Sequence, residues 1–350
     1  MKKVVLFLTL ILLSTVVFTA GVAAAARDGG DESGDAGLVV IANRGSGSIS
    51  VIDVQTGALV GTYDLPGENS AEPMYVTYSR QGNHVFVGDR ANDQVVVFDA
   101  ADFSVVGAIP TGAGVWHMWA DPRDQILWVN NDIDNTATVI DPQALTVIAT
   151  VPMPADLVAG GFVPHDVIIE PGGRYAYVTM LGGESENDYL IQFSTKTFRE
   201  RNRAAVGKDP HVSLTRRNEL IYVPAQNSDV VGVFSRNTLQ RVTEIEVPGA
   251  HGAAMSTNGK VFYTTNLPGG GTDGLFAIDV HTNTPIGSID TPYAGPHNVV
   301  ATNNNKLFLT HSGPTSDKVT IYAVSAGDPV PALIGEVTVG LNPFGLGYVP

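Results

Sequence analysis

Histidines recur at one kind of place in this sequence, and their chemistry gives the first indication of function. Five of the 8 His residues stand at the start of a short strand-like run, as in "FVPHDVIIEPGG", "DPHVSLT" and "GPHNVVAT". Neutral imidazole is the commonest side-chain ligand for borderline transition metals, and it also serves as a general base. If the fold brings these strand starts together, several imidazoles meet in one site. The five are His117, His165, His211, His251 and His297.

The strands that carry these histidines belong to a repeat of about 45 residues, a period typical of propellers and solenoids. One unit runs "PHDVIIEPGGRYAYVTM", a polar loop and "DYLIQFSTKTFRERNRAAVGKD", which indicates four short strands. Apolar and polar residues alternate in strands such as "SISVIDV", and Gly-containing turns such as "PGGR" separate the strands. Four strands in each repeat, without helical periodicity, predict an all-β fold, a β-propeller of four-stranded antiparallel blades.

Counting the strands predicts seven blades. The second strand of the repeat occurs seven times, from "LVVIAN" to "LFLTHS", and so does the first strand. The N-terminal repeat lacks its own first strand, and "FGLGYV" (344–349) provides an extra one at the C-terminal end. We therefore expect the C-terminal strand to join the N-terminal blade, which closes the ring and removes free sheet edges.

The repeat resembles a known family. Its second strands read like "YVTN", its third strands like "VxVID", and its turns "PGGR" and "TNGK" like "PDGK", over nearly all of residues 38–350. The chain is thus similar to the YVTN-repeat seven-bladed propellers. This resemblance implies the fold rather than an activity, because propellers host many unrelated functions. A histidine-lined channel mouth is similar in concept to that of the nitrous oxide reductase propeller, and to selenium-binding-protein-like and zinc-chaperone propellers.

In such a blade the first strand lines the central channel, and the residue before it lies at the channel mouth. In blade order we expect there Met74, His117, His165, His211, His251, His297 and Phe344. The second strand returns to the same mouth, and its closing positions hold Asn43, Asp89, Asn131, Met180, Ala225, Thr265 and His311. The prediction is a rim of six histidines, with Met74, Asp89 and Asn43 as additional rim residues.

Six imidazoles on separate strands can supply three or four ligands to one ion, which predicts a copper or zinc site. A thioether from Met74 would favour copper(I), and the lack of a carboxylate-rich cage argues against calcium or magnesium. Asp166 can orient a neighbouring histidine or form a hydrogen bond between blades. Two other interpretations stay open: the imidazoles bond carbonyls of the crossing loops, or one of them transfers a proton at an organic substrate.

Residues beside the rim receive structural interpretations. Trp116 and Met118 are expected to pack the inner strands of neighbouring blades together. Lys208 and Asp209 are expected, with the arginines that precede them, to form a solvated edge on an outer strand or its loop. The Gly-rich stretch 268–274 is not followed by a helix or by Lys-Ser/Thr, so no nucleotide cofactor is expected.

Composition narrows the compartment and the partners. A basic start, an apolar run from Val4 to Phe18 and small residues up to Ala26 predict a cleaved signal peptide over 1–26. An acidic, flexible leader over 27–37 and the propeller domain over 38–350 follow. The chain has no Cys and no later stretch that can span a bilayer, and its formal net charge of −15 disfavours nucleic acid. We expect a secreted or periplasmic protein that needs no disulfides.

Together these patterns predict an exported propeller that binds copper or zinc at the channel mouth, for metal handling or metal-dependent redox chemistry. One alternative is a non-enzymatic scaffold that recognises a periplasmic protein partner or a cell-surface ligand. Another is a lactonase- or lyase-like enzyme that uses a mouth histidine as general base. The sequence does not separate an enzyme from a binding protein.

Overall fold

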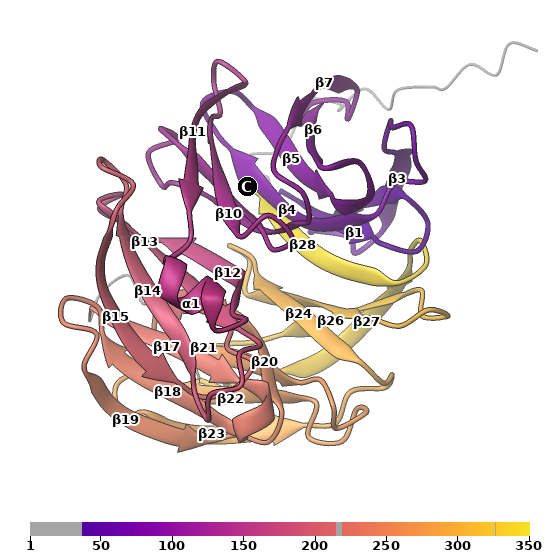
Figure 1. The fold of residues 1–350 in the computed structure, drawn as a ribbon. Helices are drawn as coiled ribbons and strands as arrows, with labels where there is room; N and C mark the ends of the chain where they lie inside the picture. The colour runs from indigo at the N-terminus through magenta and orange to yellow at the C-terminus, as the bar shows by residue number, and fades with distance from the viewer. Residues whose placement is uncertain (1–36, 215–218, 326) are drawn as a thin grey trace, which may run out of the picture. The chain divides into compact units, whose positions relative to one another are not determined.

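The computed structural model describes residues 37–214, 219–325 and 327–350, and within them the chain forms seven four-stranded sheets. All strand pairs within these sheets are antiparallel, as in the first and last blades. Figure 1 shows the sheets as blades arranged around a ring. The predicted all-β seven-bladed propeller is therefore confirmed. The predicted signal peptide, and the leader up to residue 36, lie outside the described residues.

Blade 1 is built from two distant segments of the chain. The C-terminal strand β28 (Pro343–Val349) pairs with β1 (Leu38–Asn43), which is followed outward by β2 (Ser48–Asp53) and β3 (Leu59–Asp64). In Figure 1 the yellow β28 lies beside the indigo β1. This is the ring closure that the strand count predicts, and it gives β1 a partner on its inner edge.

The other six blades follow the chain from the inner to the outer strand. Blades 2, 3 and 4 consist of β4 (Pro73–Ser79), β5 (His84–Asp89), β6 (Gln94–Asp99) and β7 (Val105–Pro110); β8 (Val115–Ala120), β9 (Leu127–Asn131), β10 (Thr136–Asp141) and β11 (Thr146–Pro152); and β12 (Val163–Ile169), β13 (Tyr175–Leu181), β14 (Asp188–Ser194) and β15 (Glu200–Val206). Blades 5, 6 and 7 consist of β16 (Ser213–Leu214), β17 (Leu220–Ala225), β18 (Val230–Ser235) and β19 (Arg241–Glu246); β20 (Ala250–Met255), β21 (Val261–Asn266), β22 (Leu275–Asp279) and β23 (Thr284–Ile289); and β24 (Pro296–Ala301), β25 (Lys306–His311), β26 (Lys318–Ala323) and β27 (Ala332–Thr338).

Helices are few among the described residues. They are α1 (Ala155–Ala159) and the short 3-10 turns η1 (Arg90–Asn92) and η2 (Gln226–Ser228). None of the helices in this part of the chain is long and apolar enough to cross a membrane.

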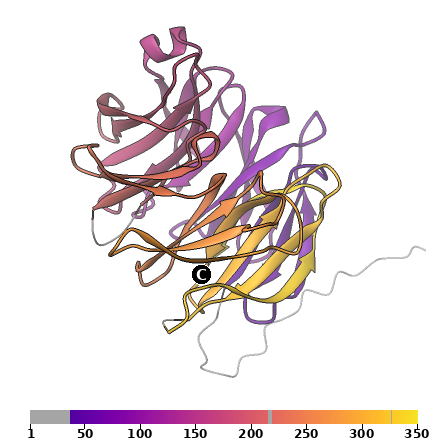
Figure 2. The same ribbon diagram turned by 90° about the horizontal axis from the view of Figure 1, so that it is seen from below.

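The core lies between the blades. Strand β1 is buried at every position, whereas the outer strand β3 alternates between exposed and half-buried positions. The described residues form seven buried hydrophobic clusters, each shared by neighbouring blades; one joins Val40 of blade 1 to Val85 of blade 2. Another cluster, which contains Val39 and Phe308, joins blade 7 to blade 1. The strands of these two blades lie side by side in Figure 2. Hydrophobic burial between sheet faces thus holds each inner strand in a fixed place.

Candidate functional site

A β-bulge in the inner strand of six of the seven blades positions the candidate site. In blade 4 the pairing shifts between Pro164 and Val167, so that His165 and Asp166 both lie opposite Thr179. The same shift occurs in blades 1, 2, 3, 6 and 7. In blade 5 the register does not shift, because Pro210 pairs with Ala225 and Ser213 with Tyr222. For all seven blades we call the two residues at this place the first and second bulge residues. A bulge re-aims the side chains that it carries. The two bulge residues of each blade therefore have different surroundings.

The first bulge residue is a histidine in four consecutive blades, 4 to 7, and we call these four the imidazole arc. Their rings touch in sequence, with centroids 4.8, 3.8 and 4.7 Å apart along the arc. Three of the four are almost completely buried. The members are His165, His211, His251 and His297. The structure thus brings together four of the six predicted rim histidines.

In blades 1 to 3 the first bulge residue is hydrophobic, and Phe344, Met74 and Trp116 form what we call the hydrophobic arc. It meets the imidazole arc at both ends, since Phe344 lies 4.1 Å from His297 and Trp116 lies 5.5 Å from His165, between ring centroids. Met74 is buried in the hydrophobic cluster of blades 2 and 3. Its thioether packs among apolar side chains, so the structure gives no support to the prediction that Met74 is a copper(I) ligand.

His117 lies one residue away from the predicted place. It is the second bulge residue of blade 3, and Trp116 occupies the position that the sequence assigned to it. The Nδ1 atom of His117 accepts a hydrogen bond from the Val167 N–H at 3.1 Å, and its ring packs on Tyr75 at 4.3 Å. This side chain therefore ties blade 3 to blade 4 through a nitrogen that is no longer available as a ligand.

His311 is separate from the arc. Its Nε2 lies 2.9 Å from the Thr320 hydroxyl and its Nδ1 lies 3.3 Å from the Ala294 carbonyl oxygen, so both ring nitrogens have partners within blade 7 and the loop that leads into it. Grouping His311 with the other rim histidines was wrong for this reason. The prediction for blade 6 was also off by one residue, because its second strand ends at Asn266 rather than Thr265.

The two other predicted rim residues are likewise bonded near their own strands. The Asn43 amide donates to the hydroxyls of Ser48 and Ser50. The Asp89 carboxylate accepts hydrogen bonds from the Glu72 N–H and from the Asn92 amide. Both side chains stabilise local turns and strands, and neither bonds to the imidazole arc.

Four ring nitrogens of the imidazole arc are buried and have no hydrogen-bond partner. They are Nδ1 of His165, Nε2 of His211 and both nitrogens of His251. A buried polar atom without a partner costs about 1–3 kcal/mol, and proteins normally satisfy such atoms with a protein group, an ordered water or an ion. Imidazole nitrogens with free lone pairs in three adjacent blades can coordinate a metal ion.

A carboxylate orients one imidazole of the arc. Asp166 Oδ2 lies 3.2 Å from His211 Nδ1 and also accepts a hydrogen bond from the Val212 N–H. Burial alone would raise the pKa of Asp166, but the charges of His117 and His211 and the hydrogen bond from His211 hold it below its usual value. Burial opposes protonation of His211, yet Asp166 raises the pKa of this histidine. With Nδ1 engaged by Asp166, Nε2 is the atom that faces a ligand.

The other three imidazoles of the arc are held neutral. Burial, reinforced by the charge of His211, lowers the pKa of His165 and of His297 to about 3. Burial and the charges of His211 and His297 hold the pKa of His251 well below its usual value. Neutral imidazole is the form that binds metal ions, so these three imidazoles are in the ligand state.

Asp209 is the functional candidate that the sequence analysis missed. Its carboxylate and the rings of His165 and His211 offer ligand atoms that all lie within 4.8 Å of one another. The predicted solvated edge is wrong here, because the Asp209 N–H and the Lys208 ammonium both bond to the buried carboxylate of Asp188 at 2.7 Å. The available signal was position, since Asp209 stands two residues before a ring histidine.

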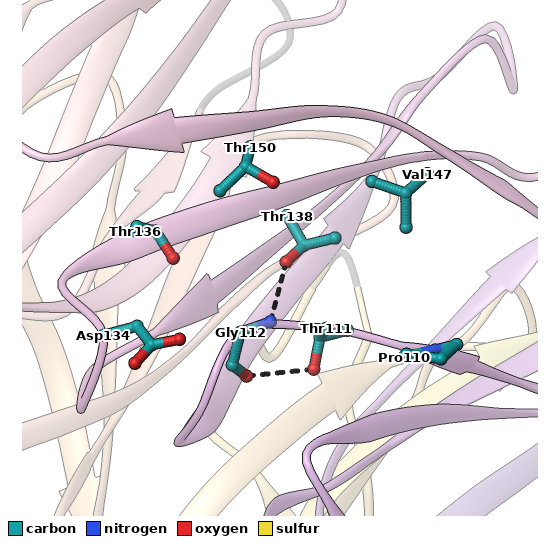
Figure 3. A pocket seen from close by; sticks show the side chains of 8 residues that line it. All are labelled: Pro110, Thr111, Gly112, Asp134, Thr136, Thr138, Val147 and Thr150. Carbon is teal, nitrogen blue, oxygen red and sulfur yellow. Dashed lines mark hydrogen bonds between the residues drawn. The ribbon is translucent and has the colours of Figure 1, made fainter.

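Two cavities in the described part of the chain lie away from the arc. One, of about 360 Å³, lies between blades 2 and 3 and is lined by threonine hydroxyls and Asp134. In Figure 3 the Gly112 N–H donates to the Thr138 hydroxyl on its floor, at 3.2 Å. The other, of about 490 Å³, is lined by Arg123, Arg174 and other residues of blades 3 and 4. Neither contains an arc residue, so we place the candidate site by its ligand chemistry.

Comparisons with known proteins agree on the fold. Residues 31–251 match the model of a family described as "Lactonase, 7-bladed beta-propeller". Kuenenia stuttgartiensis hydrazine synthase is 15% identical over 79% of this chain and 89% of that chain, with a TM-score of 0.67. A protein assigned as a 6-phosphogluconolactonase of Bacteroides uniformis is 16% identical over 90% of this chain and 100% of that chain, with a TM-score of 0.70. None of the curated proteins matches the sequence. Identities this low show a shared fold, not a shared activity.

Proposed function

This chain belongs to the lactonase family of seven-bladed β-propellers, and on that premise we propose that its imidazole arc binds a copper or zinc ion. The site acts in metal handling or in redox chemistry at the bound metal. The family fixes the scaffold and leaves the chemistry to the site, because one propeller fold supports many activities.

The observation that carries this proposal is the set of unpaired ring nitrogens on His165, His211 and His251. Several neighbouring imidazoles that are neutral, buried and partly unsatisfied form a preorganised ligand set for a borderline metal ion. Zinc and copper(II) fit such a nitrogen-rich site. Copper(I) fits less well, since the sulfur of Met74, at the equivalent position of blade 2, is buried in a hydrophobic cluster.

Metal titration of the purified chain tests the proposal directly. We expect close to one equivalent of zinc or copper(II) to bind to the chelator-treated protein, measured by calorimetry and by elemental analysis after gel filtration. His165→Phe should abolish binding and still fold, because Phe344 fills the equivalent position of blade 1. His281→Ala is the matched control, since His281 is exposed in a turn and should not affect binding. A chain that takes up neither metal would leave the scaffold interpretation in place.

Lactone hydrolysis is the second candidate, favoured by the family and by the hydrogen-bonded pair of Asp166 and His211. In this reaction His211 would take a proton from water as the water oxygen attacks the lactone carbonyl. The ring C–O bond then breaks, and the proton passes to the departing alkoxide. Acid release from a panel of γ- and δ-lactones checks this function. Activity that survives a chelator and disappears in His211→Gln would favour hydrolysis without a metal.

We further propose that the chain acts outside the cytoplasm, in the periplasm or secreted. The support is the N-terminal sequence, in which a basic start, an apolar core and small residues precede Arg27. The absence of Cys suits this placement, because no thiol is exposed to oxidation. N-terminal sequencing of the protein recovered from the producing cells should find Arg27 as the first residue. An intact Met1 on the recovered protein would contradict export by cleavage.

A further inference from the structure

The residue two positions before the ring residue has a left-handed backbone in five of the seven blades. In three of these blades it is a glycine: Gly114, Gly249 and Gly295 have φ values of 80°, 58° and 66°. Glycine suits this conformation, and an added Cβ would meet neighbouring atoms at 2.2 to 2.4 Å in all three. Blade 5 departs from this solution, because it places Asp209 there with φ of 57°. Blade 1 uses Asn342, with φ of 53°.

Aspartate and asparagine tolerate this conformation better than other non-glycine residues, so the backbone at Asp209 is compatible with a side chain that carries a carboxylate into the ring. A ligand oxygen of Asp209 lies, with one nitrogen each of His165 and His211, in a group whose atoms are within 4.8 Å of one another. Ligands around one tetrahedral zinc are roughly 3.5 Å apart, so small side-chain rotations close the group around an ion.

The neighbours of this group orient its side chains, and among the described residues the Asp209 carboxylate accepts only a long hydrogen bond, 3.5 Å, from the Asn227 amide. Asp166 engages Nδ1 of His211, which directs Nε2 outward as the unpaired atom. Nδ1 of His165 is also buried without a hydrogen bond to a described residue, and it lies 3.7 Å from Asp166 Oδ1. The Asp209 main chain is fixed independently, because its N–H donates to Asp188 at 2.7 Å. Two of the three candidate ligands, His211 and Asp209, are thus held by separate anchors.

From this geometry we propose that His165, His211 and Asp209 form an asymmetric two-histidine, one-carboxylate site for a divalent borderline cation such as zinc. The inference rests on the proposed function and narrows it, since the ion lies at the blade 4–blade 5 end of the arc and not at its centre. Three protein ligands leave a coordination position open to water or a small anion. The carboxylate oxygen favours zinc, cobalt(II) or iron(II) over copper(I).

Asp209→Gly tests the site without damaging the fold. Glycine adopts the required φ freely, so the melting temperature of the metal-free variant should be no lower than that of the wild type. Its zinc affinity should fall by at least about 100-fold, because removing even an indirect partner of a metal site costs 10–100-fold. Asn342→Gly is the matched control: it makes the same backbone change at the equivalent position of blade 1 and should leave zinc affinity unchanged.

Titration of zinc chloride into the chelator-treated wild type, His165→Phe, His251→Leu and the two glycine variants separates the outcomes. The inference predicts weak binding in His165→Phe and Asp209→Gly, a smaller loss of affinity in His251→Leu, and wild-type binding in Asn342→Gly. Wild-type affinity in Asp209→Gly with loss in His251→Leu would overturn the inference and place the ion at the centre of the arc, leaving the proposed function intact. Failure of the wild type to bind zinc or copper would overturn both.

Discussion

The two arcs of the ring occupy equivalent positions at the start of the inner strands of adjoining blades, yet their chemistry differs. Blades 1 to 3 fill the position with Phe344, Met74 and Trp116, which belong to one hydrophobic cluster or border it. Blades 4 to 7 fill it with four histidines, and three of these carry unpaired buried nitrogens. The guanidinium groups of Arg44 and Arg90 cover the aromatic rings of the hydrophobic arc at 5.0 Å. The imidazole arc has the Asp166 carboxylate instead.

This difference shows that the propeller does not need an imidazole at the bulge. If histidine served only to fix the crossing loops, the hydrophobic arc would lack something that its blades require, yet blades 1 to 3 have the same bulge and the same pairing. Repetition of a purely structural residue would also extend around the ring. The confinement of histidine to four consecutive blades therefore favours a function for the imidazole arc.

The largest expected effect comes from removing the imidazole that is hydrogen-bonded to the buried carboxylate of Asp166. His211→Leu should destabilise the fold by about 3–5 kcal/mol, because it leaves Asp166 buried without its main partner. Urea unfolding of the metal-free protein measures the loss. Adding Asp166→Asn should recover most of it, since no buried charge remains. An equal loss in the single and double variants would show that the packing of His211, and not its pairing with Asp166, stabilises this blade.

The reverse exchange brings an imidazole into the hydrophobic arc. Phe344→His should cost about 2 kcal/mol, because packing against Tyr75 and Trp116 is lost and a polar ring is buried without a designed partner. Phe344→Leu, which keeps the apolar character, provides the control and should cost less. Equal stability of the two variants would mean that the hydrophobic arc accepts an imidazole as readily as an apolar side chain, and would contradict the difference between the arcs.

His311, a hydrogen-bonded imidazole outside the imidazole arc, is expected to have a smaller and pH-dependent effect on the stability of the fold. Burial lowers the pKa of His311 to about 4, although the carbonyls of Ala294 and Tyr293 and the charge of Glu336 oppose the shift. Because the folded pKa is depressed, the unfolded chain takes up a proton first as the pH falls. His311 therefore makes its full contribution to the free energy of unfolding above about pH 6.5, and this contribution is lost as the pH falls from there to about 4. At pH 5.5 the loss in the free energy of unfolding is about 1 kcal/mol.

His311→Asn separates this contribution from those of other groups. Asn43 fills the equivalent position of blade 1 and bonds two hydroxyls there, so asparagine should be tolerated in blade 7. Thermal unfolding of both proteins at pH 7.5 and pH 5.5 should show a smaller drop for the variant. An identical drop would mean that His311 does not titrate in this window.

The smallest expected effect is at the most unsatisfied imidazole. His251→Leu should leave the metal-free protein as stable as the wild type, or more stable by about 1 kcal/mol, because it removes two buried nitrogens without partners. Chemical denaturation provides the measurement. A loss above about 2 kcal/mol would show that His251 makes structural hydrogen bonds, through water for example, and would weaken the contrast between the arcs.

The fold could be predicted because its signals are local. Alternating strands, Gly-containing turns and the spare strand "FGLGYV" together specify seven blades and their closure, and the structure pairs β28 with β1. The site was predictable in part. A proline precedes the ring residue in five blades, as Pro164 precedes His165, whereas blade 3 has Val115 there. An alignment of blade 3 on its histidine assigns His117 to the ring position, whereas an alignment on Gly114 assigns Trp116, the residue that the structure places there.

By itself, then, the sequence determined the number of blades, the closure of the ring and the placement of histidines on the inner strands. The tertiary structure decided which of them meet. Two residues share one partner at each bulge, so a shift of one residue separates a ring side chain such as Trp116 from a cross-blade tie such as His117. It also decided that Asp209 faces His165 of the preceding blade. Contacts between blades depend on how sheets pack, and no local pattern in the chain encodes them.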